Sequence, residues 1–167
     1  MQSLENRIWR SRLATSTKLK LYNTCILPIF LYGSDCWAIS QRDARRIDAL
    51  DQRCLRMLLG IKWYQYVRNN NVWRLMKQPK LTAIMQSCQL TLFGHIMCMD
   101  DNADANRILL VPPPVEWRRQ PGRPRVTWLS IIQQVLKQHH LTLPKAADLA
   151  QNCPLWRMMS TYGAMQS

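Results

Sequence analysis

Hydrophobic residues recur at helical spacing along most of the chain, and the clearest pattern lies in residues 41–59. At about 100° per residue, one broad side of this segment collects Ala44, Ile47, Leu50, Cys54, Leu55 and Leu58. The opposite side collects five arginines within an arc of about 100°: Arg42, Arg45, Arg46, Arg53 and Arg56. Asp48 and Asp51 fall outside that arc, so they do not neutralise it directly. The pattern predicts a helix with an apolar inner side and a basic outer side, here named the arginine face.

The same periodicity predicts helices over most of the remaining sequence. Residues 18–39 become apolar on every side from Ile26 onward, which predicts a central position in the fold. A buried strand is the alternative for residues 25–32, but Pro28 cannot donate to a strand ladder and favours a kinked helix. Most of the five glycines stand where a helical pattern stops. Further helices are expected over 3–13, 70–76, 81–97, 103–110, 128–136, 144–151 and 154–159, giving an all-α fold.

A proline run divides this helical pattern. Val111-Pro112-Pro113-Pro114 predicts a stiff, extended linker, and a basic segment follows it. We therefore predict a helical region over 1–110, a Pro- and Arg-rich linker over 111–125, and a small C-terminal helical subdomain over 126–167.

Composition points to a polyanionic partner. The 167 residues include 23 Lys and Arg against 10 Asp and Glu, a formal net charge of +13. Nucleic acid, either RNA or DNA, is the expected partner. A membrane surface ranks second, because it needs a free apolar helix face and most apolar residues here suit a core. Exposed helix faces are commonly charged, so the arginine face fits either an ordinary solvated surface or a phosphate-binding one.

Two other segments carry basic residues. The run 61–68 contains three aromatic residues together with Lys62 and Arg68, a mixture that can stack bases while holding phosphates. Tryptophans at helical spacing are more often core residues, and we prefer that interpretation for this run. A second basic cluster contains Arg118, Arg119, Arg123 and Arg125. Its Gly122-Arg123-Pro124-Arg125 string resembles an AT-hook core. Pro121 stands where that motif has a basic residue, which favours a simple turn before the next helix.

No residue set predicts a metal site, a cofactor or a catalytic centre. Cys88, His95 and Cys98 are the one close grouping of metal-ligand types, and they lack a Cys-x-x-Cys pair. The six cysteines are expected to be reduced and mostly small core residues. Without an apolar leader or a stretch of roughly 20 apolar residues, the chain is expected to be soluble and intracellular, in the cytoplasm or the nucleus.

Several strings together resemble one family. In order and spacing they are similar to the region after the polymerase palm in non-LTR retrotransposon reverse transcriptases, over about residues 18–157. The strings are Leu31-Tyr32-Gly33-Ser34-Asp35-Cys36-Trp37, Arg53-Cys54-Leu55-Arg56 with Leu59-Gly60-Ile61, Phe93-Gly94-His95, and Gly122-Arg123-Pro124-Arg125 with Trp128. The resemblance implies a helical thumb and a C-terminal segment of a protein that copies element RNA into DNA, with the palm upstream. Cys98 departs from the family, which usually has arginine there.

The resemblance also bears on Asp100-Asp101. The pair is similar to the Asp-Asp of the catalytic hairpin in reverse transcriptases, but it lies well past the palm motif and suits a helix N-terminus. We therefore expect a non-catalytic chain that binds nucleic-acid backbone. Its other expected partner is the missing palm, for which an apolar patch around Ile8, Trp9 and Leu13 is the candidate contact surface. Self-association through this patch is an alternative. The other hypotheses are an AT-hook-like module and an inactive remnant of a decayed element.

Overall fold

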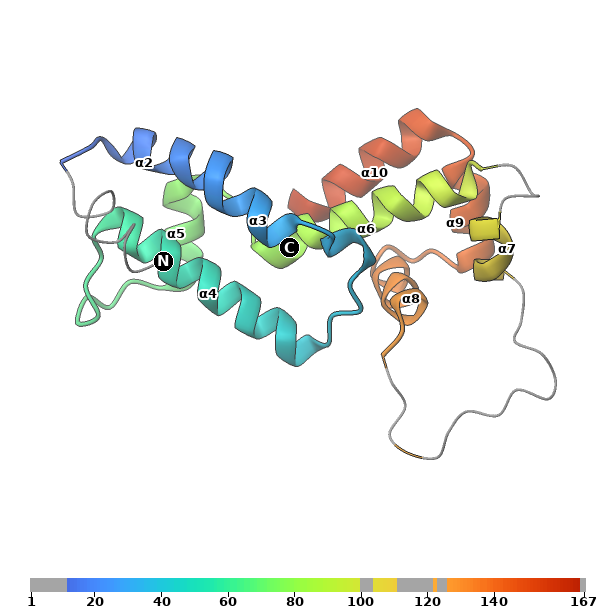
Figure 1. Ribbon diagram of the computed structural model, residues 1–167, viewed down its shortest axis with the longest axis horizontal. Helices are drawn as coiled ribbons and strands as arrows, with labels where there is room; N and C mark the ends of the chain where they lie inside the picture. Colours follow the sequence, from blue (N-terminus) through green and yellow to red (C-terminus); the bar gives the residue numbers. More distant parts are fainter. Residues whose placement is uncertain (1–11, 100–103, 111–121, 123–125, 166–167) are drawn as a thin grey trace.

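The protein is all-helical in the part that the computed structural model describes, residues 12–99, 104–110, 122 and 126–165. The first elements of the described part are α2 (Thr15–Leu21), a π-helical turn η2 (Tyr22–Ile26) and α3 (Leu27–Leu31), which together form one bent helix (Figure 1). No β-strand occurs among the described residues, which confirms the expected all-α class. The helix predicted over 3–13 lies almost entirely outside the described residues.

This first helix differs from its prediction in its end point and its burial. It stops at Leu31 instead of continuing to residue 39, because Tyr32 is extended and Gly33 takes a left-handed conformation, φ +66°. Pro28 stands in the first turn of α3, directly after the π-helical turn, so the expected kink takes that form. The predicted central position is wrong. Ile29 and Tyr32 are 73% and 85% exposed, since the described neighbours cover only the side that carries Tyr22 and Ile26.

The second long helix, α4 (Gln41–Leu59), has the predicted bounds. Ser40 begins it, because its Oγ accepts a hydrogen bond from the backbone N–H of Asp43 at 3.3 Å. Gly60 ends it in a left-handed conformation, φ +67°. Cys54, Leu55 and Leu58 are buried as the apolar pattern predicts, whereas Leu50 remains 40% exposed.

The remaining helices follow the predicted order closely. They are α5 (Asn69–Met76), α6 (Leu81–Met97), α7 (Asp104–Leu110), α8 (Trp128–Gln138), α9 (Leu143–Ala150) and α10 (Cys153–Met165). A capping box of Thr127 and Ser130 begins α8. The last helix continues six residues beyond its predicted end at residue 159.

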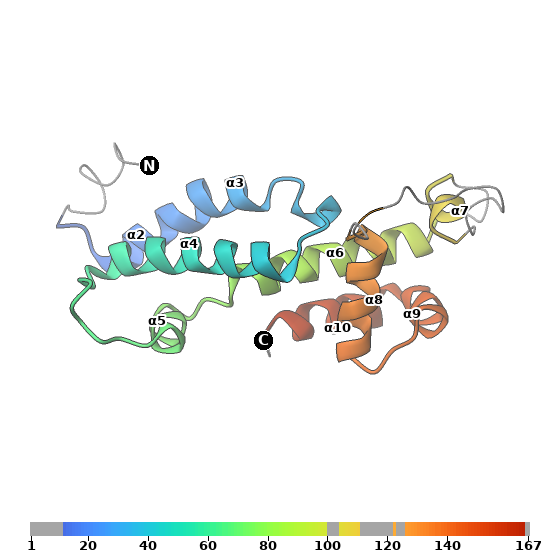
Figure 2. The same cartoon turned by 90° about the horizontal axis from the view of Figure 1, so that it is seen from below.

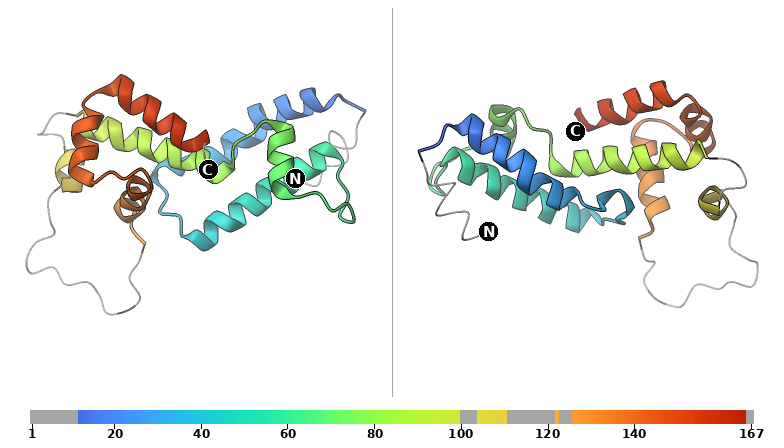
Figure 3. Two further views of the ribbon diagram at one scale, coloured as in Figure 1. Left: turned by 180° about the vertical axis from the view of Figure 1, so that it is seen from behind. Right: turned by 45° about the horizontal axis from the view of Figure 1, so that its top comes forward.

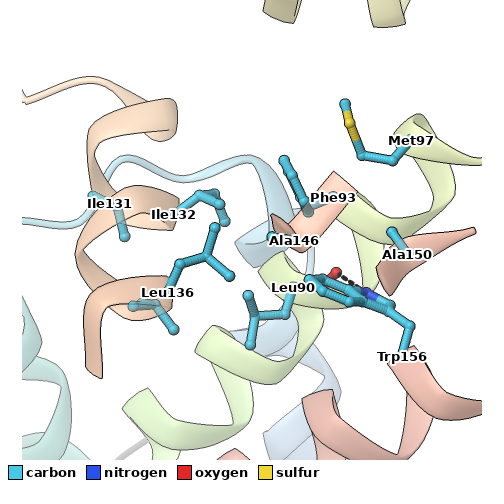
Figure 4. Close-up of a cluster of buried hydrophobic side chains, with 10 residues drawn as sticks. Leu90, Phe93, Met97, Ile131, Ile132, Leu136, Ala146, Ala150 and Trp156 are labelled. Atoms are coloured by element: carbon cyan, nitrogen blue, oxygen red, sulfur yellow. Dashed lines mark hydrogen bonds between the residues drawn. The ribbon is translucent and has the colours of Figure 1, made fainter. Parts of the chain in front are cut away.

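Buried side chains gather in two hydrophobic cores. The first lies between the bent N-terminal helix, α4 and α5 and contains Tyr22, Ile26, Cys54, Leu55, Leu58, Val72 and Met76. The second lies where α8, α9 and α10 pack on the C-terminal half of α6 (Figures 3 and 4), with Leu90, Phe93, Ile132 and Trp156 among its members. Because α6 joins the second core, the C-terminal helices pack directly on the helical region that precedes the linker. The linker, 111–125, lies outside the described residues apart from Gly122, so the division of the chain into the predicted parts remains a prediction.

A short 3₁₀ turn, η3 (Ser34–Cys36), stands between the two cores. The buried amide of Gln89 donates hydrogen bonds to the carbonyl of Trp37 at 2.8 Å and to that of Ser34 at 3.4 Å. The indole N–H of Trp128 donates to the carbonyl of Asp35 at 2.6 Å. This turn therefore ties α6 and α8 to the end of the first helix.

The cysteines are less buried than expected. Only Cys54 is buried, Cys88 is intermediate, and the other four are exposed. All six are free thiols in the structure.

Candidate nucleic-acid interface

The orientation of α4 depends on a buried carboxylate. Asp51 is 3% exposed and accepts hydrogen bonds from the Tyr22 hydroxyl at 2.5 Å and from the Trp73 indole N–H at 3.2 Å. Burial raises the pKa of this carboxyl, against the two hydrogen bonds, which lower it. The network joins α4 to the π-helical turn on one side and to α5 on the other. Helical periodicity gave no sign of it, because an acid beside an apolar face is normally solvated.

A second acid of α4 holds the start of α6. The carboxylate of Asp48 accepts from the backbone N–H of Thr82 at 3.2 Å and from its hydroxyl at 2.9 Å. It thereby satisfies one of the free N–H groups at a helix N-terminus, where negative charge is favoured. Both Asp48 and Asp51 are engaged inside the fold, and the arginine face is turned away from them.

The arginine face is largely open to solvent. Arg42, Arg45, Arg46 and Arg53 are exposed, and Arg56 is half-buried. Arg46 Nη1 lies 3.8 Å from a carboxylate oxygen of Asp43, an exposed pair one turn apart that contributes little to stability. Asp43 was not part of the sequence prediction. Its position three residues after Ser40, in the first turn of the helix, indicates a capping role.

Arg56 has a structural function. Its guanidinium donates to the carbonyl of Val67 at 2.5 Å and to the side-chain oxygen of Asn69 at 2.9 Å. It therefore fastens the segment between α4 and α5 to the end of α4. The other four arginines of the face are the ones most available to a ligand.

A hollow lies at each end of the arginine face. The first, of about 620 Å³, lies between the start of α4 and α8, and its lining includes Arg42, Arg46 and Gln134. The second, of about 390 Å³, lies beside the end of α4 and is lined by Arg53, Arg56 and Trp63 among others.

The aromatic residues after α4 are exposed, so the preferred core interpretation of this run is wrong. Trp63 is 94% exposed, Tyr66 is fully exposed, and Tyr64 is 53% exposed. Gly60 ends the helix, and the following residues form turns, so the helical spacing that suggested a core does not arise. We name residues 61–67 the aromatic loop. It lies at the end of the molecule away from α9 (Figure 2).

Other predicted residues give a mixed outcome. The second basic cluster, Arg118, Arg119, Arg123 and Arg125, lies outside the described residues, as do Asp100 and Asp101. His95 is exposed, and Cys98 points to a different neighbour: its Sγ lies 3.4 Å from that of Cys153, 55 positions later in the chain. Within the described ranges, no group of three or more His, Cys, Asp or Glu could hold a metal ion. None of the described helices has the length and apolarity needed to cross a membrane.

Comparison with known proteins gives one informative similarity. A segment of 69 residues is 32% identical to the probable RNA-directed DNA polymerase from transposon X-element of Drosophila melanogaster. The match covers 41% of this chain and 7% of the relative's length, so it corresponds to a small part of that protein. No family model matches the chain, and no solved structure matches it significantly. The similarity relates the chain to a transposon-encoded RNA-directed DNA polymerase, as the motifs predict.

Proposed function

We propose that this chain is the thumb and post-thumb part of a non-LTR retrotransposon reverse transcriptase and binds the backbone of primer and template through the arginine face. The exposed arginines of α4, of which only Arg46 has an acid of the same helix, Asp43, within 4 Å, are the observation that carries the proposal. The similarity to a transposon polymerase supports it, as does the net charge of +13.

The dimensions of the face suit a double helix. Arg42 and Arg53 are 11 positions apart, which corresponds to about 16 Å along an α-helix. At 3.4 Å per base pair, that length follows roughly five base pairs of a duplex. Contacts of this kind position a nucleic acid without selecting its sequence. A thumb needs that property, because a polymerase must hold every sequence that it copies.

In this proposal, nucleotides are joined by a palm domain in another part of the parent protein, and the present chain binds the primer and template. The apolar side chains left uncovered near the start of the chain, Leu13, Ile29 and Tyr32, are 46%, 73% and 85% exposed. They form the surface that we assign to contact with that palm, in addition to the predicted patch at Ile8 and Trp9, which lies outside the described residues.

The proposal is tested by removing charge from the arginine face without disturbing the fold. Arg56 is kept, because it fastens the aromatic loop. A variant with glutamine at positions 42, 45, 46 and 53 is compared with the native protein for binding to a DNA duplex and an RNA–DNA hybrid across a salt series. If each arginine neutralises one phosphate, log affinity depends on log salt with a slope of about −0.9 per contact on duplex DNA. The variant should therefore lose affinity and show a slope that is shallower by about 2 to 4.

A matched control removes the same number of positive charges from the surface of the C-terminal helices, α7 to α10. Arg107, Lys137, Lys145 and Arg157 are all exposed, and their replacement with glutamine leaves α4 unchanged. Native-like binding by this control and weak binding by the α4 variant would support the proposal. Equal losses in the two variants would assign binding to net charge alone, and unchanged binding in the α4 variant would remove the arginine face from the interface.

A further inference from the structure

The aromatic loop is fastened at its base and open at its tip. Ile61 and Val67, its first and last residues, pack against the first core. The guanidinium of Arg56 holds the carbonyl of Val67, and the Gln52 amide donates to the carbonyl of Asn69 at 3.3 Å. The segment is therefore anchored to α4 on both sides, although its central residues are not buried.

Hydrogen bonds within the loop fix its turns. The backbone N–H of Lys62 donates to the side-chain oxygen of Gln65 at 3.1 Å, and the N–H of Gln65 donates to the carbonyl of Lys62 at 3.0 Å. The N–H of Val67 then donates to the carbonyl of Gln65 at 2.8 Å. Hydrogen bonds thus fix the conformation of the loop, and none of them involves its three aromatic rings.

Two of the rings, those of Trp63 and Tyr64, contact each other, and a cation lies near the second. Trp63 and Tyr64 meet edge to face, with ring centroids 5.8 Å apart. The ammonium group of Lys62 lies 5.7 Å from the centroid of Tyr64. Leaving the apolar surface of large aromatic rings in water is unfavourable relative to burying it, and an exposed cluster of them commonly marks a binding surface.

Positive charge surrounds this cluster. Trp63 shares the 390 Å³ hollow with Arg53 and Arg56 at the end of the arginine face. The buried side chain of Gln52 also lines this hollow, and its Oε1 has no hydrogen-bond partner among the described residues. Flat rings beside phosphate-binding cations form the combination with which proteins hold unpaired nucleotides, because each base has a face to stack and each nucleotide has a phosphate. An apolar protein partner would not need the cations.

We propose that the aromatic loop binds unpaired nucleotides of single-stranded RNA or DNA, with bases stacked on Trp63 and Tyr66 and the phosphates held by Arg53. This inference rests on the proposed function and extends it: the arginine face holds duplex, and the loop holds the strand where the duplex ends. The site selects single-stranded over paired ends, because bases inside a duplex are already stacked on one another.

The test uses the full chain and three probes of one sequence: a short DNA strand, the same strand as RNA, and the blunt DNA duplex. A variant with alanine at positions 63 and 66 should bind both single strands about tenfold or more weakly, the loss expected from one or two stacked bases. It should bind the blunt duplex normally and keep the native salt slope. A variant with phenylalanine at both positions keeps flat rings and should recover most of the binding. Stronger loss on RNA than on DNA would indicate RNA as the preferred strand.

Two readouts separate this inference from the proposed function. Ile108→Ala removes a large side chain, 78% exposed, from another part of the surface and should leave single-strand binding unchanged. Quenching of tryptophan fluorescence by the single strand should disappear in Trp63→Phe while binding persists. Normal single-strand binding by the alanine variant would overturn the stacking site and leave duplex binding by the arginine face intact. Failure of the native chain to bind any probe would overturn both, and a changed association state with unchanged nucleic-acid binding would assign the loop to contact between protein copies.

Discussion

Gly94 allows α10 to pack on α6, and its substitution provides a sharp test of the second core. A Cβ atom at this position would lie 2.2 Å from the indole nitrogen of Trp156 and 2.3 Å from its Cδ1. Trp156 is 4% exposed, and its N–H donates to the carbonyl of Leu90 at 2.8 Å (Figure 4). Gly94→Ala therefore requires a buried, rigid ring to move by about 1 Å or more to reach ordinary contact distance.

Three effects decide the size of the loss. Alanine improves helix propensity by about 1 kcal/mol over glycine. Forcing an extra carbon into a packed core costs about 1–3 kcal/mol, and an indole N–H left buried without its acceptor costs about 1–3 kcal/mol more. We expect Gly94→Ala to lower the free energy of unfolding by about 1–5 kcal/mol, measured by urea unfolding followed by circular dichroism.

A double-mutant cycle isolates the contact. In a Trp156→Leu background the rigid ring is gone, so Gly94→Ala should cost little or even stabilise the helix by up to about 1 kcal/mol. Gly60→Ala is the matched control. It imposes a side chain on a left-handed residue that has no other atom within 4 Å of its Cβ position, so its cost of about 1–2 kcal/mol should be equal in both backgrounds. A native chain that gains stability from Gly94→Ala would refute the proposed packing.

Three further predictions concern contacts between helices. Asp51→Asn should cost less stability than Asp51→Leu in urea unfolding, because an amide can accept from Trp73 and donate to the Tyr22 hydroxyl; equal losses would contradict the network. Burial raises the folded-state pKa of Asp51, so the folded state binds this proton more tightly, and native stability relative to Asp51→Asn should fall as pH rises from about 3.9 through the folded value. A difference in unfolding free energy between the native protein and Asp51→Asn that does not change with pH would argue against burial of this carboxyl. Mild oxidation should join Cys98 to Cys153, whose Sγ atoms lie 3.4 Å apart, and raise stability by at most about 4 kcal/mol; peptide mapping that finds another pairing would contradict this contact.

The sequence predicts helix positions well where local signals are strong. Residues 41–59 and 81–97 have the predicted bounds. In the first of these helices, capping by Ser40 and termination by Gly60 act over one turn of helix. Pro28 also indicates the irregularity of the first helix correctly. Gly94 is an exception to the expectation that most glycines stand where a helical pattern stops. It lies inside α6, and its reason, the indole of Trp156, comes from a helix about 60 positions away.

The positions of the candidate site residues are predicted less completely. The outward direction of the arginine face follows from helical geometry alone, whereas the engagement of Arg56 with Val67 depends on the path of a loop. The exposure of Trp63 also depends on that path. The apolar character of tryptophan favours burial, whereas the turns that the Gln65 hydrogen bonds fix leave the Trp63 ring in solvent.

The exposure of Ile29 and the burial of Asp51 have one physical cause. Periodicity describes what a single helix is able to bury, but burial is decided by the elements that pack against it. Ile29 is apolar and exposed because no described helix covers its side of α3, and Asp51 is charged and buried because Tyr22 and Trp73 bring two hydrogen-bond donors to it. The exposure of each residue therefore depends on the elements that pack against its helix. A buried acid with matched donors identifies neighbours that are present in this chain, and an uncovered apolar helix face is what a chain that packs on a palm domain would leave free.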